Sequence, residues 1–252
     1  MKSRRILYIS QEIFPYLPES DVSLTARRLP QVIQEAGNDI RIFMPRFGVI
    51  NERRNQLHEV IRLSGINMII NNNDHPLIIK VASLPTARLQ VYFIDNDDFF
   101  RRKSLFGSEP KGENDNDERS IFFVRGALET IKKLRWIPDI IHCHGTFTAL
   151  GMLYLKKFYN EAEPVEMPER LFDTLKFDKI KPAAVSSMQG KVDYTALNRL
   201  AIHYAHGVVQ GSAELSPELH EYIQERGAHF LPYPGKEFDA EIYNEFYKKI
   251  LP

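Results

Sequence analysis

The chain has 252 residues, of which 43% are hydrophobic, enough to bury one large α/β core or two small ones. Lysine plus arginine and aspartate plus glutamate both number 33, so the formal net charge is zero. That balance gives no electrostatic reason to expect nucleic acid or a membrane as the main partner. The lone Cys143 excludes an internal disulfide and fits a reducing compartment. No apolar run reaches the length of a signal-peptide core or a membrane span, so we predict a cytoplasmic protein.

The first part of the chain predicts a strand-helix-strand unit. RRILYIS, residues 4–10, has the continuous apolar run of a strand buried on both faces. Two prolines make residues 11–19 a loop, and a serine and an aspartate then offer N-caps for a helix from about Val22 to Ala36, which ends at Gly37. NDIRIFMP, residues 38–45, is a second apolar strand. This β-α-β order is typical of a doubly wound α/β sheet.

The loop after the first strand is the usual ligand position in such a fold. A phosphate-binding loop needs glycines, and the sequence has none before Gly37. Glu12, Glu19 and Asp21 would also repel a phosphate group. The sequence therefore argues against a dinucleotide site in this loop.

The later segments predict an alternation of strands and helices, with no internal repeat and no composition break. Between residues 58 and 95 we expect an antiparallel excursion of four strands, at 58–65, 66–70, 77–84 and 89–95, with turns at 71–76 and 85–88. We expect a short helix and loop at 96–107, a solvated charged loop at 108–119, a helix at 120–136, a strand at 138–145 and a helix at 146–159. Residues 160–182 give no clear prediction, and 182–190 only a weak strand. The remainder predicts a helix at 195–207, a strand at 208–212, a helix at 216–227, a turn at 229–235 and a terminal helix with Phe238, Ile242 and Phe246 on its apolar face.

His142 and His144 form the most conspicuous polar cluster, on one face of the strand end because side chains alternate along a strand. With His203 and His206 they could complete a zinc site. Topology argues against it, since His144 ends its strand at the carboxyl edge of the sheet, whereas His206 precedes a strand and lies near the opposite edge. We therefore predict no metal site.

Cys143 is a poor candidate nucleophile, because both neighbouring histidines point to the other face of the strand. A buried structural cysteine is the expected role. Tyr243 and Tyr247 lie one helical turn apart and are predicted to pack rather than to form a sugar platform. The residues alone thus predict a fold but no reaction.

The order of the segments resembles the first half of bacterial glycogen and starch synthases, which are GT-B glycosyltransferases of the family 5 type. ILYISQEIFPYL, LPQVIQEAG and NDIRIFMPRFG resemble that family's opening strand and E-x-x-P-like loop, its helix ending L-P-x-x-L-x-x-x-G, and its strand ending M-P-x-Y. DNDERSIFFVRGALE resembles its D-N-x-x-R-F-x-x-F helix, and WIPDIIHCHGTFTAL resembles its P-D-I-V-H-x-H-D-W-H-T-A-L segment. YAHGVVQGSAELSPELHEYI resembles its Y-A-D-x-V-T-T-V-S-P-x-Y-A-x-E-I segment, so most of the chain is touched in order.

The resemblance implies a Rossmann-like, doubly wound, mainly parallel α/β sheet, the N-terminal half of a GT-B fold. We expect a single domain over residues 1–252, with a terminal helix at about 237–251 and no C-terminal donor-binding domain. In that family the N-terminal domain mainly holds the acceptor glucan, and the C-terminal domain binds most of the nucleotide sugar. By resemblance the activity is ADP-glucose-dependent glucosyl transfer in glycogen biosynthesis.

The chain departs from the family pattern where the family meets the donor. The family's K-T-G-G-L loop is here Pro18–Val22, and the aspartate of its first helix is Leu24. In the H-D-W-H segment both His142 and His144 are kept, but residues 145–147 read Gly-Thr-Phe. The family strand ending T-I-H-N, expected near residues 160–166, has no recognisable counterpart.

These departures predict a chain that cannot transfer glucose alone, because prolines and acids cannot stabilise a departing diphosphate. We predict a glycogen/starch synthase-like protein of α-1,4-glucan metabolism, a pseudoenzyme in isolation, whose partner is a glucan acceptor. The alternative is a non-catalytic interaction module that reuses the domain to bind a protein or a second copy of itself. A small independent enzyme using residues 142–144 is the weakest of the three interpretations.

A surviving site is expected at the carboxyl edge of the sheet, around residues 12–18, 144–146 and 186–189. Glu12 and His144 are the candidate substrate-binding residues, on position alone. The plainer role for Glu12 is to order its loop. We predict no catalytic residue and no cofactor.

Overall fold

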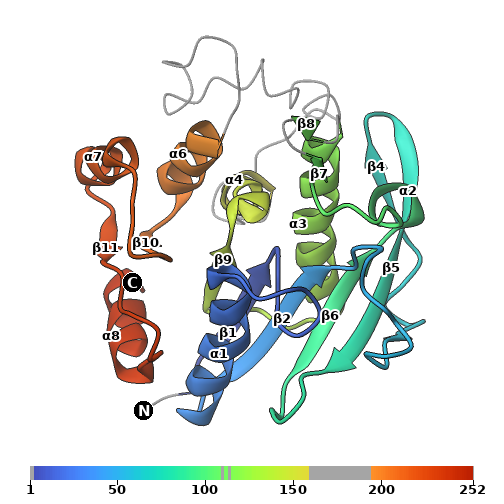
Figure 1. Cartoon of the computed structure of the whole chain (residues 1–252), viewed down its shortest axis with the longest axis horizontal. Coiled ribbons are helices and arrows are strands. Elements are labelled where there is room, and N and C mark those ends of the chain that lie inside the picture. The colour runs from blue at the N-terminus through green and yellow to red at the C-terminus, as the bar shows by residue number, and fades with distance from the viewer. Residues whose placement is uncertain (1–2, 109–110, 113–114, 159–193, 252) are drawn as a thin grey trace.

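The computed structural model describes residues 3–108, 111–112, 115–158 and 194–251. Its centre is a seven-stranded sheet in the order β3-β5-β6-β2-β1-β9, with β4 also paired to β5 (Figure 1). A parallel pair, β10 and β11, and a small hairpin, β7 and β8, lie outside this sheet. The strands are β1 (Arg5–Ser10), β2 (Asp39–Pro45), β3 (His58–Glu59), β4 (Ile66–Ile70), β5 (Asn73–Ser83), β6 (Gln90–Asp95), β7 (Gly107–Ser108), β8 (Lys111–Gly112), β9 (Ile140–His144), β10 (Gly207–Val209) and β11 (His229–Leu231).

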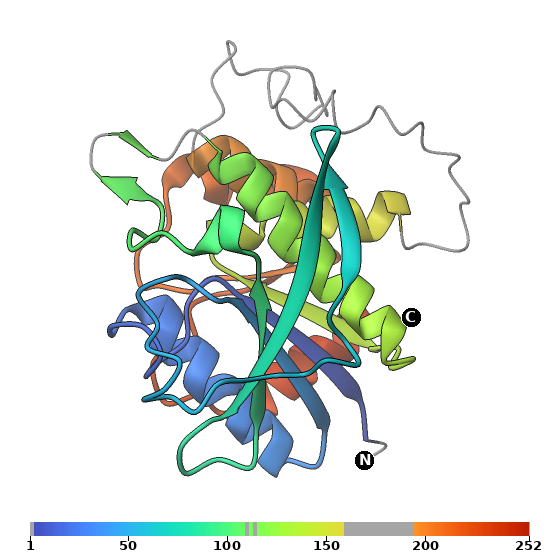
Figure 2. The same ribbon diagram turned by 90° about the vertical axis from the view of Figure 1, so that its right-hand side faces the viewer.

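Helices pack along the sheet and around the β10–β11 pair (Figures 1 and 2). They are α1 (Asp21–Glu35), α2 (Asp97–Phe100), α3 (Asn116–Lys133), the 3-10 helix η1 (Thr146–Thr148), α4 (Leu150–Phe158), α6 (Tyr194–Tyr204), α7 (Pro217–Arg226) and α8 (Ala240–Ile250). The chain runs from β1 outward to β2 and β6 and then returns past β1 to β9, and this reversal defines a doubly wound sheet. None of the helices described has both the length and the hydropathy needed to cross a membrane.

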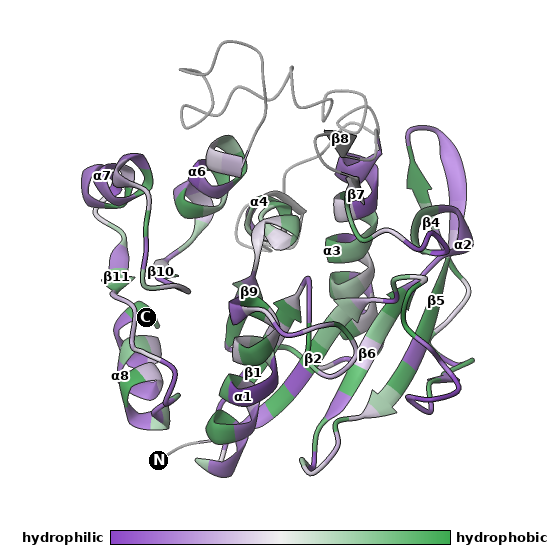
Figure 3. Ribbon diagram, viewed as in Figure 1, coloured by the Kyte–Doolittle hydropathy of each residue, from purple (hydrophilic) through white to green (hydrophobic). Residues whose placement is uncertain are grey.

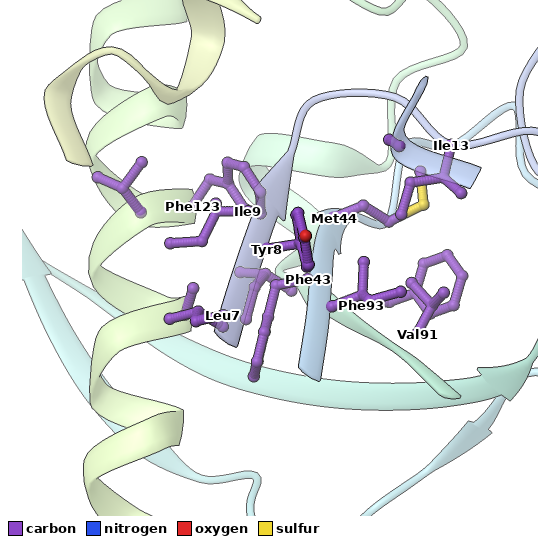
Figure 4. Close-up of a cluster of buried hydrophobic side chains, with 14 of the residues drawn as sticks. Leu7, Tyr8, Ile9, Ile13, Phe43, Met44, Val91, Phe93 and Phe123 are labelled. Carbon is purple, nitrogen blue, oxygen red and sulfur yellow. The ribbon is translucent and has the colours of Figure 1, made fainter. Parts of the chain in front are cut away.

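The core is built around β1, whose residues from Ile6 to Ile9 are fully buried. Leu7 and Ile9 point toward Phe123 of α3, as Figure 4 shows. Phe43 of β2 lies beside them and is also fully buried. Burial of each such side chain contributes about 1.5–3 kcal/mol of transfer free energy. Figure 3 shows the same pattern along the ribbon, with hydrophobic residues concentrated in the central strands. The predicted buried first strand is therefore confirmed.

The hairpin between β4 and β5 is tighter than the sequence predicts. A turn was expected over residues 71–76, but only Asn71 and Asn72 turn, with φ values of 49° and 61°. Asparagine tolerates this left-handed conformation, and two such residues match the twist of paired strands. β5 consequently begins at Asn73. The strand predicted over residues 58–65 is wrong beyond Glu59, because the chain turns back on itself after that point.

The solvated loop predicted over residues 108–119 is wrong from Asn116 onward. α3 already begins at Asn116, and Arg119 in its first turn is fully buried. Its Nε donates a hydrogen bond to the Phe99 carbonyl at 2.8 Å. Its guanidinium carbon also lies 5.6–6.0 Å from the centroids of three aromatic rings, those of Phe47, Phe100 and Phe147. A charge run in the sequence gives no sign that one arginine has an aromatic cage.

The C-terminal part contains two further corrections. Residues 229–231, predicted as part of a turn, form β11 and pair in parallel with β10. On α8 the buried face carries Tyr243 and Tyr247, while Ile242, predicted to be buried, is 39% exposed. Phe238 and Phe246 are buried as predicted, and the two tyrosines complete the buried surface in place of Ile242. The prediction that these two tyrosines pack is confirmed.

A buried ionic cluster closes the carboxyl end of β2 and β6. The Asp95 side chain is 2% exposed and forms ion pairs with Arg46, whose Nε lies 3.0 Å away, and with Lys80, whose Nζ lies 2.8 Å away. Glu52 binds the same two cations from the rim. Two carboxylates thus compensate the two positive charges, and of these only Asp95 is buried.

We predict that Asp95→Ala lowers the free energy of unfolding by about 3–5 kcal/mol, because it removes the buried carboxylate that both cations contact and leaves the buried Arg46 with only the more exposed Glu52 and Asp97. Asp97→Ala is the matched control, since Asp97 is 72% exposed and 3.7 Å from Arg46. Its effect should stay within about 1 kcal/mol. Urea unfolding of both variants measures the difference, and similar losses would contradict the assigned role of Asp95.

Candidate functional site

The candidate site lies where the order of the sheet reverses. β1 and β9 are adjacent parallel strands that end together at Ser10 and His144. The loops that follow them are joined by Gln11, whose N–H donates to the His144 carbonyl at 3.2 Å and whose Oε1 accepts from the Phe147 N–H at 3.0 Å. Ligands in doubly wound folds bind at this kind of edge. The predicted loops are therefore brought together, and residues 186–189 lie outside the described part.

A cleft of about 450 Å³ opens beside these loops, between β9 and η1 on one side and α6, β10 and α8 on the other. The polar side chains that line it include His142, His144, Thr146, Asn198, Gln210 and Tyr247. Segments far apart in the sequence thus form one concave surface. It is large enough for a small ligand or a few residues of a polymer.

Glu12 is turned away from this cleft into its own loop. Its Oε1 accepts a hydrogen bond from Gln11 Nε2 at 2.8 Å, and its Oε2 accepts one from Ser20 Oγ at 2.7 Å. The Ser10 hydroxyl donates to the Glu12 carbonyl at 2.7 Å. Both carboxylate oxygens are therefore engaged in ordering the loop. A substrate-binding role for Glu12 stays a prediction and would need these bonds to exchange.

The same loop ends in a closed cap on α1. Ser20 accepts a hydrogen bond from the Ser23 N–H at 3.0 Å, and Ser23 Oγ accepts one from the Ser20 N–H at 2.8 Å, which is a capping box. Asp21 in the first turn pairs with Lys236 at 3.0 Å. The N-terminus of α1 is thus capped by its own serine side chains and has the acidic Asp21 beside them. This arrangement is unfavourable for a bound diphosphate.

His142 and His144 lie on one face of β9, as alternation predicts. Their rings stack with centroids 4.2 Å apart, and the Tyr8 ring lies 5.4 Å and 5.6 Å from them. Burial lowers the pKa of His142 to about 4. Burial, together with the neighbouring His142, holds the pKa of His144 well below its usual value. Both rings are therefore neutral at pH 7, and His144 Nε2 is buried without a hydrogen-bond partner among the described residues.

The surroundings of these residues favour neither nucleophilic catalysis by Cys143 nor a zinc site that includes His203 and His206. Burial raises the pKa of the Cys143 thiol to about 12, although a hydrogen bond with Thr148 lowers it slightly, so the thiolate is rare at pH 7. His203 Nδ1 lies 3.3 Å from the Tyr222 hydroxyl, and His206 Nε2 lies 3.0 Å from Lys156 Nζ. Within the part of the chain that the structure describes, no three histidine, cysteine, aspartate or glutamate side chains are grouped to hold a metal ion.

Sequence reasoning missed the groups that shape the site from behind. Tyr247 of α8 lies 2.8 Å from His142 Nδ1 and 3.0 Å from the Tyr8 hydroxyl. Gly145 has φ 87° and ψ 155°, and a Cβ built there would lie 2.3 Å from the Gln11 side chain. For the contact with Tyr247, the only sign in the sequence was Tyr8, a tyrosine inside an otherwise aliphatic strand. Nothing in the sequence indicated the second.

Gly145→Ala should lower the free energy of unfolding by at least the roughly 1–3 kcal/mol that such backbone costs a non-glycine residue. The clash with Gln11 should add to this loss. In a Gln11→Ala background the clash is gone, so the same substitution should cost less. Urea unfolding of the four proteins measures the coupling. Equal costs in both backgrounds would show that Gln11 does not limit the space at position 145.

The histidine pair on β9 predicts acid sensitivity. The folded-state pKa values lie below the ordinary value of 6.5, so between about pH 6.5 and pH 4 the unfolded chain binds more protons than the folded one. The free energy of unfolding should therefore fall as the pH decreases, by about 1.4 kcal/mol per pH unit for each histidine that stays neutral.

His142→Phe should flatten this pH dependence, whereas His229→Gln at an exposed position should not. Urea unfolding at pH 7, 6, 5 and 4 gives the slopes. Parallel curves for the wild type and His142→Phe would contradict the assignment.

Comparisons with known proteins agree with this architecture. Residues 5–173 match the family model described as the starch synthase catalytic domain. The glycogen synthase of Chlorobium luteolum is 39% identical over 167 residues, covering 64% of this chain and 34% of the relative. That of Chlorobium limicola is 40% identical over 160 residues, covering 62% of this chain and 32% of the relative. The chain thus spans about a third of the length of the curated relatives it matches.

A solved structure extends the similarity to nearly the whole chain at the level of fold. The catalytic domain of starch synthase IV from Arabidopsis thaliana, bound to ADP and acarbose, aligns with a TM-score of 0.67 and 18% identity. It covers 92% of this chain, which covers 51% of it. The predicted α/β fold with a mainly parallel sheet, similar to the GT-B catalytic domain, is confirmed. The family model matches well over half of the residues, and the chain therefore belongs to the starch synthase catalytic domain family.

Proposed function

We propose that this chain acts in α-1,4-glucan metabolism as a glycogen/starch synthase-type domain that holds the glucan acceptor. The observation that carries the proposal is the cleft at the reversal of the sheet, in a chain that matches the family over residues 5–173. A neutral, buried His144 suits a glucan, because an uncharged imidazole can form a hydrogen bond with a sugar hydroxyl and needs no counter-ion in a buried site. This proposal places the chain in the cytoplasm, as its composition predicts.

The donor reaction is a separate matter, and we propose that the chain does not transfer glucose from ADP-glucose by itself. A retaining transfer must stabilise an oxocarbenium-like centre and a leaving diphosphate. Where the family resemblance places K-T-G-G-L, the chain has Pro18–Val22, with Glu19 and Asp21 in place of a cation. The helix that begins there is capped by Ser20 and Ser23. These features oppose the diphosphate on charge and leave it few backbone donors.

Native affinity electrophoresis tests the acceptor proposal. The purified chain should be retarded in gels that contain glycogen, relative to gels without it. His144→Phe keeps the ring but removes its nitrogens, and it should weaken binding by about tenfold, the equivalent of about 1.4 kcal/mol for a lost buried hydrogen bond. His229→Gln, at an exposed position that does not itself line the cleft, should bind as the wild type does.

Unchanged wild-type mobility in glycogen would overturn the acceptor proposal and leave the protein-interaction module as the function to test. An assay with labelled ADP-glucose and glycogen completes the design. Incorporation of label above the blank by pure monomeric protein would refute the second proposal while leaving the first intact.

A further inference from the structure

A buried chain of hydrogen bonds joins three distant parts of the sequence behind the cleft. The Tyr8 hydroxyl on β1 lies 3.0 Å from the Tyr247 hydroxyl on α8, and that hydroxyl lies 2.8 Å from Nδ1 of His142 on β9. Tyr8 is 0% exposed and Tyr247 is 1% exposed. The chain ends at Tyr8, whose hydroxyl has no further hydrogen-bond partner within the described residues.

The direction of these bonds follows from counting polar hydrogens. If Tyr8 donates to Tyr247 and Tyr247 donates to His142 Nδ1, both hydroxyl hydrogens are bonded and only a lone pair on Tyr8 is left over. In the opposite direction Nδ1–H donates to Tyr247 and Tyr247 donates to Tyr8. The Tyr8 hydrogen is then buried without an acceptor, which costs much more than an unused lone pair. The first direction is therefore favoured.

We propose that Tyr247 is a positioning residue that fixes His142 as the tautomer with Nδ1 accepting and Nε2 carrying the proton. His142 lines the cleft, and its Nδ1 is engaged with Tyr247. Any hydrogen bond from this ring to a molecule in the cleft is consequently donated by Nε2–H. A residue of the terminal helix α8 thus decides which ring nitrogen of His142 donates a hydrogen bond, although the two residues are 105 positions apart in the sequence.

The tautomer narrows what the cleft accepts, and this step rests on the proposed glucan-binding function. A ring that offers Nε2–H cannot ligate a metal ion or remove a proton through that atom, because the lone pair it would need is absent. It can donate to a hydroxyl or ether oxygen. The stacked His144 ring, 4.2 Å away, offers its own unpartnered Nε2 beside it. Together they fit an uncharged, hydroxyl-bearing ligand.

Long-range ¹H–¹⁵N correlation spectra of the histidine rings test the proposal without any ligand. In the full chain at pH 7, the ¹⁵N signals of His142 should show an unprotonated Nδ1, shifted by an accepted hydrogen bond, and a protonated Nε2. Tyr247→Phe should abolish the shift at Nδ1. Tyr243→Phe, one turn earlier on the same buried face, is the matched control and should leave both signals in place.

Tyr8→Phe separates the two directions of the chain. It should leave the tautomer intact, because Tyr247 can still donate to His142. A wild-type Nδ1 that carries the proton would overturn the proposal even if Tyr247→Phe does not fold. A Tyr247→Phe spectrum identical to that of the wild type, or a tautomer that changes in Tyr8→Phe, would also overturn it. None of these readouts involves glycogen, so failure of glucan binding alone would count against the proposed function and leave the role of Tyr247 standing.

Discussion

The parallel pairing of β1 with β9 is the constraint on which the rest of the site depends. β1 is buried from Ile6 to Ile9, so its register against its neighbours is fixed by packing on both faces. A shift of one residue would move Tyr8 to the face of α3 and place Leu7 against the histidines. Because the register holds, Ser10 and His144 end side by side, and the two loops that follow must share the same edge of the sheet.

The loops themselves show how one departure from the family pattern is built into its surroundings. In the resemblance, Gly145 stands where the family has an aspartate. Its backbone adopts φ 87° and ψ 155°, which glycine alone accepts readily, and the Gln11 side chain fills the space that a Cβ would need. Gln11 then bonds the first turn of η1 and the Glu12 carboxylate. The segment is thus held by its own hydrogen bonds, and an aspartate at position 145 would meet both the strained backbone and the Gln11 side chain.

The regular elements could be predicted because their patterns are local. The apolar run of β1, the capped period of α1 and the alternation on β9 each lie within one segment, and the structure confirms them. The features that could not be predicted depend on long-range contacts. Arg119 reads as surface charge until three aromatic rings from other segments surround it. Glu12 and His144 were chosen on the same positional ground, yet only His144 lines the cleft. Residues 160–166, where the sequence shows no counterpart of the family's strand, lie outside the described residues.

The charged and titratable groups described at the carboxyl edge of the sheet disfavour an anionic ligand. A nucleotide-sugar donor brings a diphosphate, and a site for it needs cations or open backbone donors near the sheet edge. This edge has two neutral histidines, a loop with acids and a helix start that is capped by its own serine side chains. To bind a diphosphate here, the protein would have to bury a positive charge beside the two histidine rings, whose surroundings already oppose their protonation. An uncharged ligand meets no such penalty, because neutral imidazoles and hydroxyl groups can satisfy one another by hydrogen bonds alone. Under the proposed function, the packing of the histidines against Tyr8 and Tyr247 therefore also favours an uncharged ligand.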